Sequence, residues 1–161
     1  MVSRGLIEVK LRERHLLDRV DLQTYQPGEE IQIGPFVIEP YHVCHSIPDG
    51  VGLGITTPAG LIVHSGDFKF DHTPVDGRST DIAKLAEFSQ RGVLVLLSDS
   101  TNADHAGFTA SEQTLTSALE DIFREAKGRI IVATFASLIS RIQQVMDVAR
   151  RFGRKVALAG T

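Results

Sequence analysis

The chain has 161 residues, of which 42% are hydrophobic, and a formal net charge of −3 at pH 7, which is typical of an ordinary globular protein. No apolar run approaches the roughly 20 residues needed to cross a bilayer, and the N-terminus lacks the apolar segment of a signal peptide. A single cysteine, Cys44, excludes an internal disulfide. These features predict a cytoplasmic protein with no membrane association.

Charge is distributed unevenly along the chain. Residues 124–161 carry eight Lys/Arg and two Asp/Glu. Residues 1–123 carry nine Lys/Arg and eighteen Asp/Glu. An acidic body with a basic end is compatible with a metal-centred site beside a surface that binds polyanions. A solvated basic helix face explains the same charges equally well.

The first half of the chain is rich in predicted strands. Residues 12–19 indicate the end of a helix, and Pro27-Gly28 is a turn signal. The strand-like runs that follow are residues 30–33, 35–43, 51–57 and 61–65. Pro58-Ala-Gly60 joins the last two runs and predicts a hairpin. Pro40 predicts an edge position or a bulge in the second run.

After residue 78 the pattern alternates between helices and strands. Helices are predicted over residues 81–88, 109 to about 125, and 137–152, the last with Ile139, Ile142, Val145, Met146 and Ala149 facing inward. Thr109 and Glu112 form a candidate capping box. Strands are predicted over 93–97, which we expect to be buried on both faces, 129–135 and 155–158. The whole pattern predicts an α/β fold. A chain that ends on a strand also indicates a truncated domain.

Two loops after strands carry candidate metal ligands. His45 follows the second strand, and neutral imidazole suits zinc, although a structural role explains a lone histidine as well. Asp67 follows Gly66, which permits close backbone approach. The two oxygens of Asp67 could bridge two cations about 3.5–4 Å apart; the alternative is a turn aspartate that accepts backbone N–H bonds.

Further candidates lie later in the chain. Asp99, after the apolar run 93–97, could orient a ligand histidine or accept N–H bonds from its own turn. At the start of the helix 137–152, N–H groups and an arginine make a candidate phosphate site, formed by Ser137, Ser140 and Arg141; capping by Ser137 explains that serine equally well. We expect Cys44 to be a small buried residue, and expect solvated side chains at Lys69, Asp71, His72 and His105.

Taken together, four motifs in order resemble the ribonuclease J family, along essentially all 161 residues. The motifs are His45-Ser-Ile-Pro-Asp49, Gly66-Asp-Phe-Lys69, Ser98-Asp-Ser-Thr-Asn-Ala103, and Thr134-Phe-Ala-Ser137 followed by Ser140-Arg-Ile-Gln-Gln144. The resemblance implies a partial metallo-β-lactamase αββα sandwich over residues 1–110. This sandwich would run into the start of a β-CASP domain over residues 111–161.

The resemblance also implies an activity and roles. The activity would be metal-dependent hydrolysis of RNA, both 5′→3′ exonucleolytic and endonucleolytic, with two zinc ions, or Mn or Mg in their place. By the same resemblance, His45 would be a zinc ligand, Asp67 would bridge both ions, and Asp99 would support the metal site, so that Asp67 and Asp99 are the catalytic candidates. RNA is the implied partner, and a homodimer or homotetramer the implied assembly.

The sequence departs from the family pattern in several places. No H-x-H-x-D-H cluster occurs; we expect it to lie upstream of Met1, and the later family histidines to lie beyond Thr161. Leu138 replaces the usual Asn, and Cys44 the common Thr. We therefore expect the isolated chain to bind zinc weakly and to be inactive. Two alternatives stay open: another metallo-β-lactamase hydrolase, such as a thioesterase, and a non-catalytic RNA-binding or subunit-contact remnant.

Overall fold

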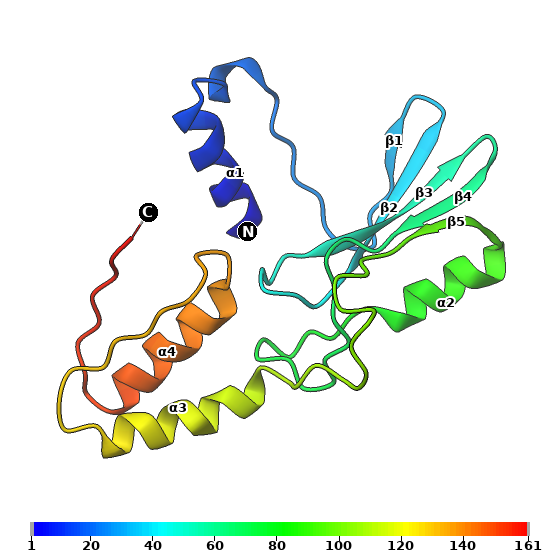
Figure 1. The fold of residues 1–161 in the computed structure, drawn as a ribbon. Coiled ribbons are helices and arrows are strands. Elements are labelled where there is room, and N and C mark those ends of the chain that lie inside the picture. Colours follow the sequence, from blue (N-terminus) through cyan, green and yellow to red (C-terminus); the bar gives the residue numbers. More distant parts are fainter. Residues whose placement is uncertain (1, 161) are drawn as a thin grey trace.

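The structure is a computed structural model and describes residues 2–160. A mixed sheet with the strand order β1-β2-β3-β4-β5 forms its largest layer (Figure 1). Neighbouring strands are antiparallel except β4 and β5, which are parallel. The strands are β1 (Ile31–Ile33), β2 (Phe36–His42), β3 (Val51–Thr57), β4 (Gly60–His64) and β5 (Val93–Leu97). The predicted α/β fold, the first four strands and the hairpin are therefore confirmed.

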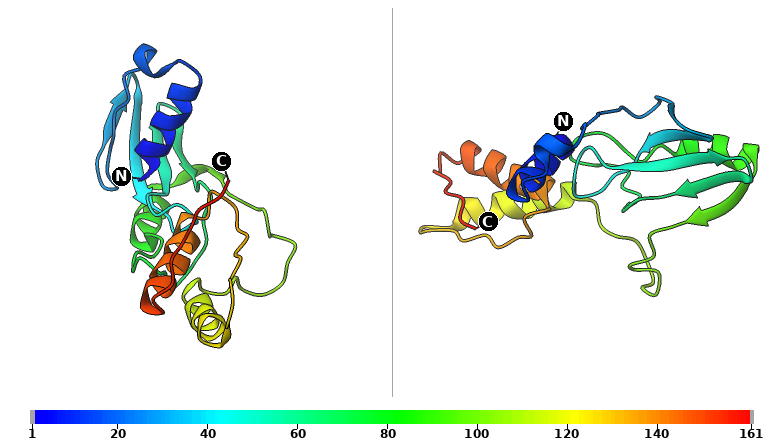
Figure 2. Two further views of the ribbon diagram at one scale, coloured as in Figure 1. Left: turned by 90° about the vertical axis from the view of Figure 1, so that its left-hand side faces the viewer. Right: turned by 90° about the horizontal axis from the view of Figure 1, so that it is seen from above.

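The helices take three different positions relative to this sheet. One helix packs on the sheet, two lie side by side away from it, and the first helix lies apart from both, as the views in Figures 1 and 2 show. They are α1 (Val2–Glu13), followed by the short helix η1 (Leu17–Arg19), α2 (Ile82–Arg91), α3 (Gln113–Glu125) and α4 (Ile139–Arg151). Within residues 2–160, none of these helices has the length and apolar character that a bilayer crossing requires.

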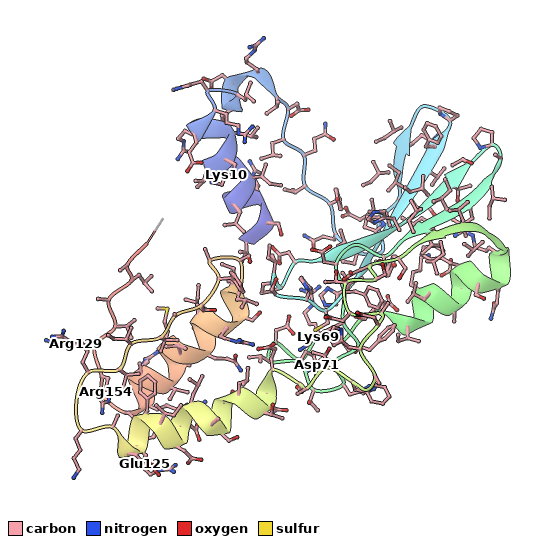
Figure 3. The ribbon with its side chains drawn as sticks, viewed as in Figure 1. Lys10, Lys69, Asp71, Glu125, Arg129 and Arg154 are labelled. Carbon is pink, nitrogen blue, oxygen red and sulfur yellow. The ribbon has the colours of Figure 1, made fainter. Side chains whose placement is uncertain are left out.

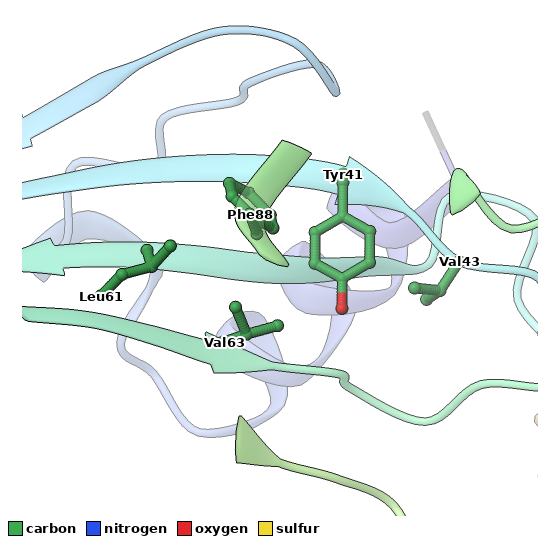
Figure 4. Packing of buried hydrophobic residues seen from close by; sticks show 5 residues of the cluster. All are labelled: Tyr41, Val43, Leu61, Val63 and Phe88. Atoms are coloured by element: carbon green, nitrogen blue, oxygen red, sulfur yellow. The ribbon is translucent and has the colours of Figure 1, made fainter. Parts of the chain in front are cut away.

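The main core lies between the sheet and α2 (Figure 4). Phe88 of α2 is fully buried, and its ring meets that of Tyr41 edge-on, with centroids 5.8 Å apart. Val43, Leu61 and Val63 complete this cluster. A second, smaller core joins α3 to α4 through Phe123, Val148 and Ala149. Ala149 is buried as predicted, whereas Met146 is 40% exposed, contrary to the prediction.

Pro40 shows how a proline fits inside this sheet. β2 lies between β1 and β3, but its pairing with β1 ends at Ile38. The carbonyl of Pro40 points to the β1 side and accepts a hydrogen bond from the Gly28 N–H at 3.1 Å. The nitrogen of a strand residue points the same way as its carbonyl, so no ladder bond is lost. Pro40 therefore lies at a local edge, as predicted, because β2 is an inner strand but has no β1 residue beside it at this position.

The prediction that residues 93–97 are buried on both faces is wrong. Every residue of β5 is exposed, Leu94 to 59% and Leu96 to 62%. Because β5 is the edge strand and pairs with β4 alone among residues 2–160, its side chains stay accessible. The predicted strands 129–135 and 155–158 are also not formed, and Ile131 is 87% exposed. No strand of the described chain lies beside them to pair with their backbone.

Two predicted helix ends also differ in detail. The first helix ends at Glu13, and residues 17–19 form the separate turn η1. The expected capping box of Thr109 and Glu112 is absent, since the Glu112 side chain caps no N–H of α3 and its carboxylate binds Arg141 instead. By contrast, Gly153, two residues after the end of α4, has φ +63°, and a left-handed residue there ends the helix as predicted.

A buried carboxylate joins α2 to the sheet. Glu39 of β2 is 6% exposed and accepts hydrogen bonds from Lys84 Nζ at 2.9 Å and Arg91 Nη1 at 2.7 Å. Both cations also lie over the Phe88 ring. Burial, the largest single influence, raises the pKa of Glu39, but the bonds and charges of the two cations outweigh it. The net effect lowers the pKa of Glu39 below its ordinary value of 4.5.

We expect Glu39→Gln to lower the free energy of unfolding at pH 7 by about 1.5–3 kcal/mol, the usual worth of hydrogen bonds to charged groups. Because the folded-state pKa is lowered, this stabilisation is present above pH 4.5 and is lost as the pH falls through the folded-state value. Urea unfolding followed by circular dichroism at several pH values from 7 down to about 3 measures it.

Glu87→Gln is the matched control for this prediction. Glu87 pairs with the same two cations, at 2.8 Å and 3.5 Å, but its side chain is 50% exposed. Exposed pairs contribute about 0–1 kcal/mol, so this variant should change stability little at any pH. Equal losses from the two variants, or a Glu39→Gln effect that grows toward acid pH, would contradict the assignment.

Candidate functional site

The candidate residues meet at one edge of the sheet. β2, β4 and β5 run in the same direction, since β3 is antiparallel to both β2 and β4 and β5 is parallel to β4. Their carboxyl ends therefore lie together, and the loops that leave them meet at that edge. A cleft of about 450 Å³ opens there, and its walls include His45, Asp67 and Asp99. Each of these residues follows a different strand of the three.

His45 lies exposed on the loop after β2. Its Nδ1 is 3.1 Å from the Ser46 hydroxyl. The base of the loop is fixed by the bond from the Val43 N–H to the Gly50 carbonyl and by the bond from the Lys69 N–H to the Cys44 carbonyl. Cys44 is buried, as predicted, and burial is the main cause that raises the pKa of its thiol. The loop therefore presents an imidazole on a fixed backbone.

Asp67 owes its position to the glycine before it. Gly66 has φ +62°, and a Cβ atom there would lie 2.7 Å from the Val51 carbonyl oxygen. Only glycine allows the chain to pass so close to β3 in this conformation. Asp67 is exposed at the cleft. Within residues 2–160 no turn N–H donates to its carboxylate, so the structure does not show the alternative turn role.

Asp99 combines the two roles considered for it. Its Oδ1 accepts hydrogen bonds from the Thr101 hydroxyl at 2.7 Å and the Thr101 N–H at 3.0 Å, which is the turn role. These bonds are the main cause that lowers the pKa of Asp99, and the Phe68 N–H and the charge of His45 lower it further. Its carboxylate therefore stays ionised at neutral pH and lies near both of the other candidates.

The three candidate phosphate-binding residues are not all brought together. Ser140 and Arg141 line the cleft, whereas Ser137 is exposed and lies outside its walls. The N–H and hydroxyl of Ser140 both donate to the Ser46 carbonyl, at 3.4 Å and 3.3 Å, which joins α4 to the loop of His45. No side chain caps α4, so Ser137 is not a cap. Arg141 pairs with Glu112 at 2.7 Å.

The expectation that Lys69 and Asp71 are solvated is wrong. Asp71 is 4% exposed, and its Oδ2 lies 3.2 Å from Lys69 Nζ (Figure 3). Burial, the largest influence, raises the pKa of Asp71, but hydrogen bonds from Ser111, Thr73, Glu112 and Lys69 outweigh it and lower the pKa overall. The expectation holds for His105, which is exposed. A loop has no periodic pattern, so the sequence carried no sign of this burial.

The donor set at the cleft is incomplete for a metal ion. Residues 2–160 contain no group of three or more His, Cys, Asp or Glu side chains arranged to hold one. A catalytic zinc ion usually has about three protein ligands. His45 and Asp67 line the same cleft and have suitable atoms, but the described chain does not form a metal centre by itself.

Comparisons with known proteins agree with the four motifs. The sequence model of the ribonuclease J beta-CASP domain matches residues 127–161. Ribonuclease J of Synechocystis sp. is 45% identical over 99% of the chain and 25% of its own length. Ribonuclease J of Thermus thermophilus is 44% identical, and ribonuclease J2 of Bacillus subtilis 40% identical, each over 97% of the chain and 28% of its own length.

The chain thus spans about a quarter of the length of the curated relatives it matches. A crystal structure of a protein of unknown function from Enterococcus faecalis shares the fold, with a TM-score of 0.59 and 16% identity over 88% of this chain and 39% of its own. Identity of 40–45% to these ribonucleases J along nearly the whole chain assigns the sequence to their family. The chain belongs to the ribonuclease J family.

Proposed function

We propose that this chain is a segment of a metal-dependent ribonuclease that hydrolyses RNA phosphodiesters, both from the 5′ end and internally. The observation that carries the proposal is the 40–45% identity to ribonucleases J along nearly all of the chain. The cleft that contains His45, Asp67 and Asp99 supports it. In this proposal residues 1–110 belong to a metallo-β-lactamase sandwich and residues 111–161 begin a β-CASP domain.

The proposed roles follow the chemistry of each side chain. His45 and Asp67 would contribute to a site for two zinc ions, or for Mn or Mg, whose other ligands lie outside the described residues. Such ions, when bound, supply positive charge that stabilises the transition state of phosphodiester hydrolysis. Asp99, ionised and near His45, would hold the imidazole in place. Ser140 and Arg141 would contact RNA phosphates, with Ser137 at the margin of that surface.

The proposal includes the surroundings in which the protein acts. RNA is the proposed partner, and the excess of Lys and Arg in residues 124–161 supports it. The single cysteine is buried and unpaired, which suits the reducing cytoplasm. We propose a homodimer or homotetramer for the protein as a whole, with no membrane attachment.

One comparison tests this function: RNA cleavage by the full-length natural protein and by the 161-residue chain alone. We expect the full-length protein to cleave RNA and a chelator to stop the cleavage. We expect the isolated chain to leave RNA intact and to bind zinc weakly in calorimetry, because it has two suitable ligands at the cleft instead of the usual three or so.

Each alternative predicts a different result in the same assay. Hydrolysis of a thioester without RNA cleavage by the full-length protein would favour a different metallo-β-lactamase hydrolase. Salt-dependent RNA binding that needs no metal, without cleavage, would favour a non-catalytic remnant. Efficient RNA cleavage by the isolated chain, abolished by Asp67→Ala, would show that 161 residues suffice for activity.

A further inference from the structure

Four charged side chains of alternating sign form a row along one wall of the cleft: Asp71, Lys69, Glu112 and Arg141. Lys69 Nζ lies 3.2 Å from Asp71 and 3.5 Å from Glu112, and Arg141 Nη2 lies 2.7 Å from Glu112. Figure 3 shows the first two in the loop region between the sheet and α3. The row therefore connects the loop after β4 with the starts of α3 and α4.

Asp71 fixes the first end of this row. Its carboxylate is buried and accepts the Thr73 N–H at 3.0 Å and the Glu112 N–H at 3.2 Å. The Ser111 hydroxyl donates to the Thr73 carbonyl at 2.8 Å, a second bond between the same two segments. These bonds join Asp71 to Glu112, 41 residues later in the chain, and Thr73 to Ser111, 38 residues later. The backbone at Glu112 consequently has a fixed position relative to the loop that contains Asp67.

Glu112 extends this fixed position to α4. Its carbonyl accepts a hydrogen bond from Gln144 at 2.8 Å, and both of its carboxylate oxygens accept from Arg141 Nη2, at 3.0 Å and 2.7 Å. A guanidinium has five N–H donors, and these bonds use only the Nη2 group. Arg141 Nε has no partner within residues 2–160, but it is buried and therefore closed to a ligand. The hydrogen bonds that Arg141 makes within the described residues leave Nη1 unused, and the side chain is 32% exposed. Donors of a guanidinium that is already oriented therefore stay available.

We propose that Glu112 is a positioning residue, which holds Arg141 at the cleft wall so that the N–H donors of Nη1 bind a phosphate oxygen of RNA. This inference rests on the proposed function and deepens it. A free arginine has many rotamers, and binding must order them at a cost in affinity. The Glu112 contact orders the side chain before RNA arrives. Lys69 offsets the charge of Glu112, so the wall does not repel the phosphate.

The test compares Glu112→Ala, Glu112→Gln, Arg141→Ala and the double alanine variant in RNA cleavage by the full-length protein. We expect Glu112→Ala to raise KM about three- to tenfold, because one long side chain must then be ordered on binding, while kcat changes less than about twofold. Glu112→Gln keeps an acceptor oxygen and should raise KM less. The double variant should have the same KM as Arg141→Ala.

Glu120→Ala is the matched control. Glu120 also pairs α3 with α4, through Arg151, but neither residue lines the cleft. This variant should leave KM unchanged. Circular dichroism and urea midpoints identify any variant that folds poorly, and Glu112→Gln supplies the measurement if Glu112→Ala does not fold.

The possible failures can be told apart. Equal KM changes from Glu112→Ala and Glu120→Ala, or additive changes in the double variant, would reduce Glu112 to a structural residue and overturn the inference. Cleavage of RNA with an unchanged KM in Glu112→Ala would also overturn it, while the proposed function stands. Absence of RNA binding and cleavage in the unsubstituted full-length protein would overturn both.

Discussion

Replacement of Asp67 by alanine is expected to reduce RNA cleavage by the full-length protein at least about a thousandfold. Asp67 lies at the cleft, exposed and without a turn N–H donor, so its carboxylate is available to bind cations. Loss of bound metal removes several kcal/mol of transition-state stabilisation, and each 1.36 kcal/mol is a factor of ten in rate. Initial rates of cleavage of a labelled RNA, at saturating Zn²⁺ and Mn²⁺, measure the effect.

The same substitution should leave the fold unchanged. An exposed side chain with no partner within residues 2–160 contributes less than about 0.5 kcal/mol to stability, so the urea midpoint should not move. Asp104→Asn is a control, since Asp104 is also an exposed loop carboxylate but lies outside the cleft walls. Undiminished cleavage by a folded Asp67→Ala protein would show that Asp67 is not a metal ligand.

The sequence was sufficient to identify the main candidates one by one, for a local reason. His45, Asp67 and Asp99 each follow an apolar run, and such runs predict strands whose ends bear functional loops. Their meeting at one edge requires only that the three strands run in one direction. The partner of Arg141 could not be found this way, because Glu112 is 29 residues away, directly before another helix. Its contact depends on how α3 and α4 pack, which no local pattern encodes.

The errors in the fold have a common physical origin. The run 93–97 and the segment 129–135 have the apolar and β-branched residues of buried strands. Composition reports the tendency of a segment to pair, but burial and pairing depend on neighbours from elsewhere in the chain. β5 pairs with one strand and stays exposed, while residues 129–135 pair with no strand of the described chain. The hairpin of β3 and β4 was predictable because its partner is adjacent in sequence.

Replacement of Gly54 by alanine is expected to destabilise the protein by about 1–3 kcal/mol or more, the usual cost of overpacking a core. A Cβ atom at Gly54 would lie 2.3 Å from Cζ of Phe88. The Phe88 ring is fully buried against Tyr41 and beneath two cations of α2, so it has no free space into which to move. A fall in the urea midpoint, followed by far-UV circular dichroism, is the expected result.

A second substitution distinguishes this clash from a general effect of alanine. Gly128→Ala adds the same methyl group where nothing lies within 4 Å, and should change the midpoint little. Phe88→Leu removes the colliding ring edge, so Gly54→Ala should cost less in a Phe88→Leu background than alone. If the two changes were instead additive, the cost of Gly54→Ala would not come from a clash with this ring. The hydrogen bond from the Asp81 N–H, at the start of α2, to the His42 carbonyl, three residues before His45, would in either case still join α2 to the cleft.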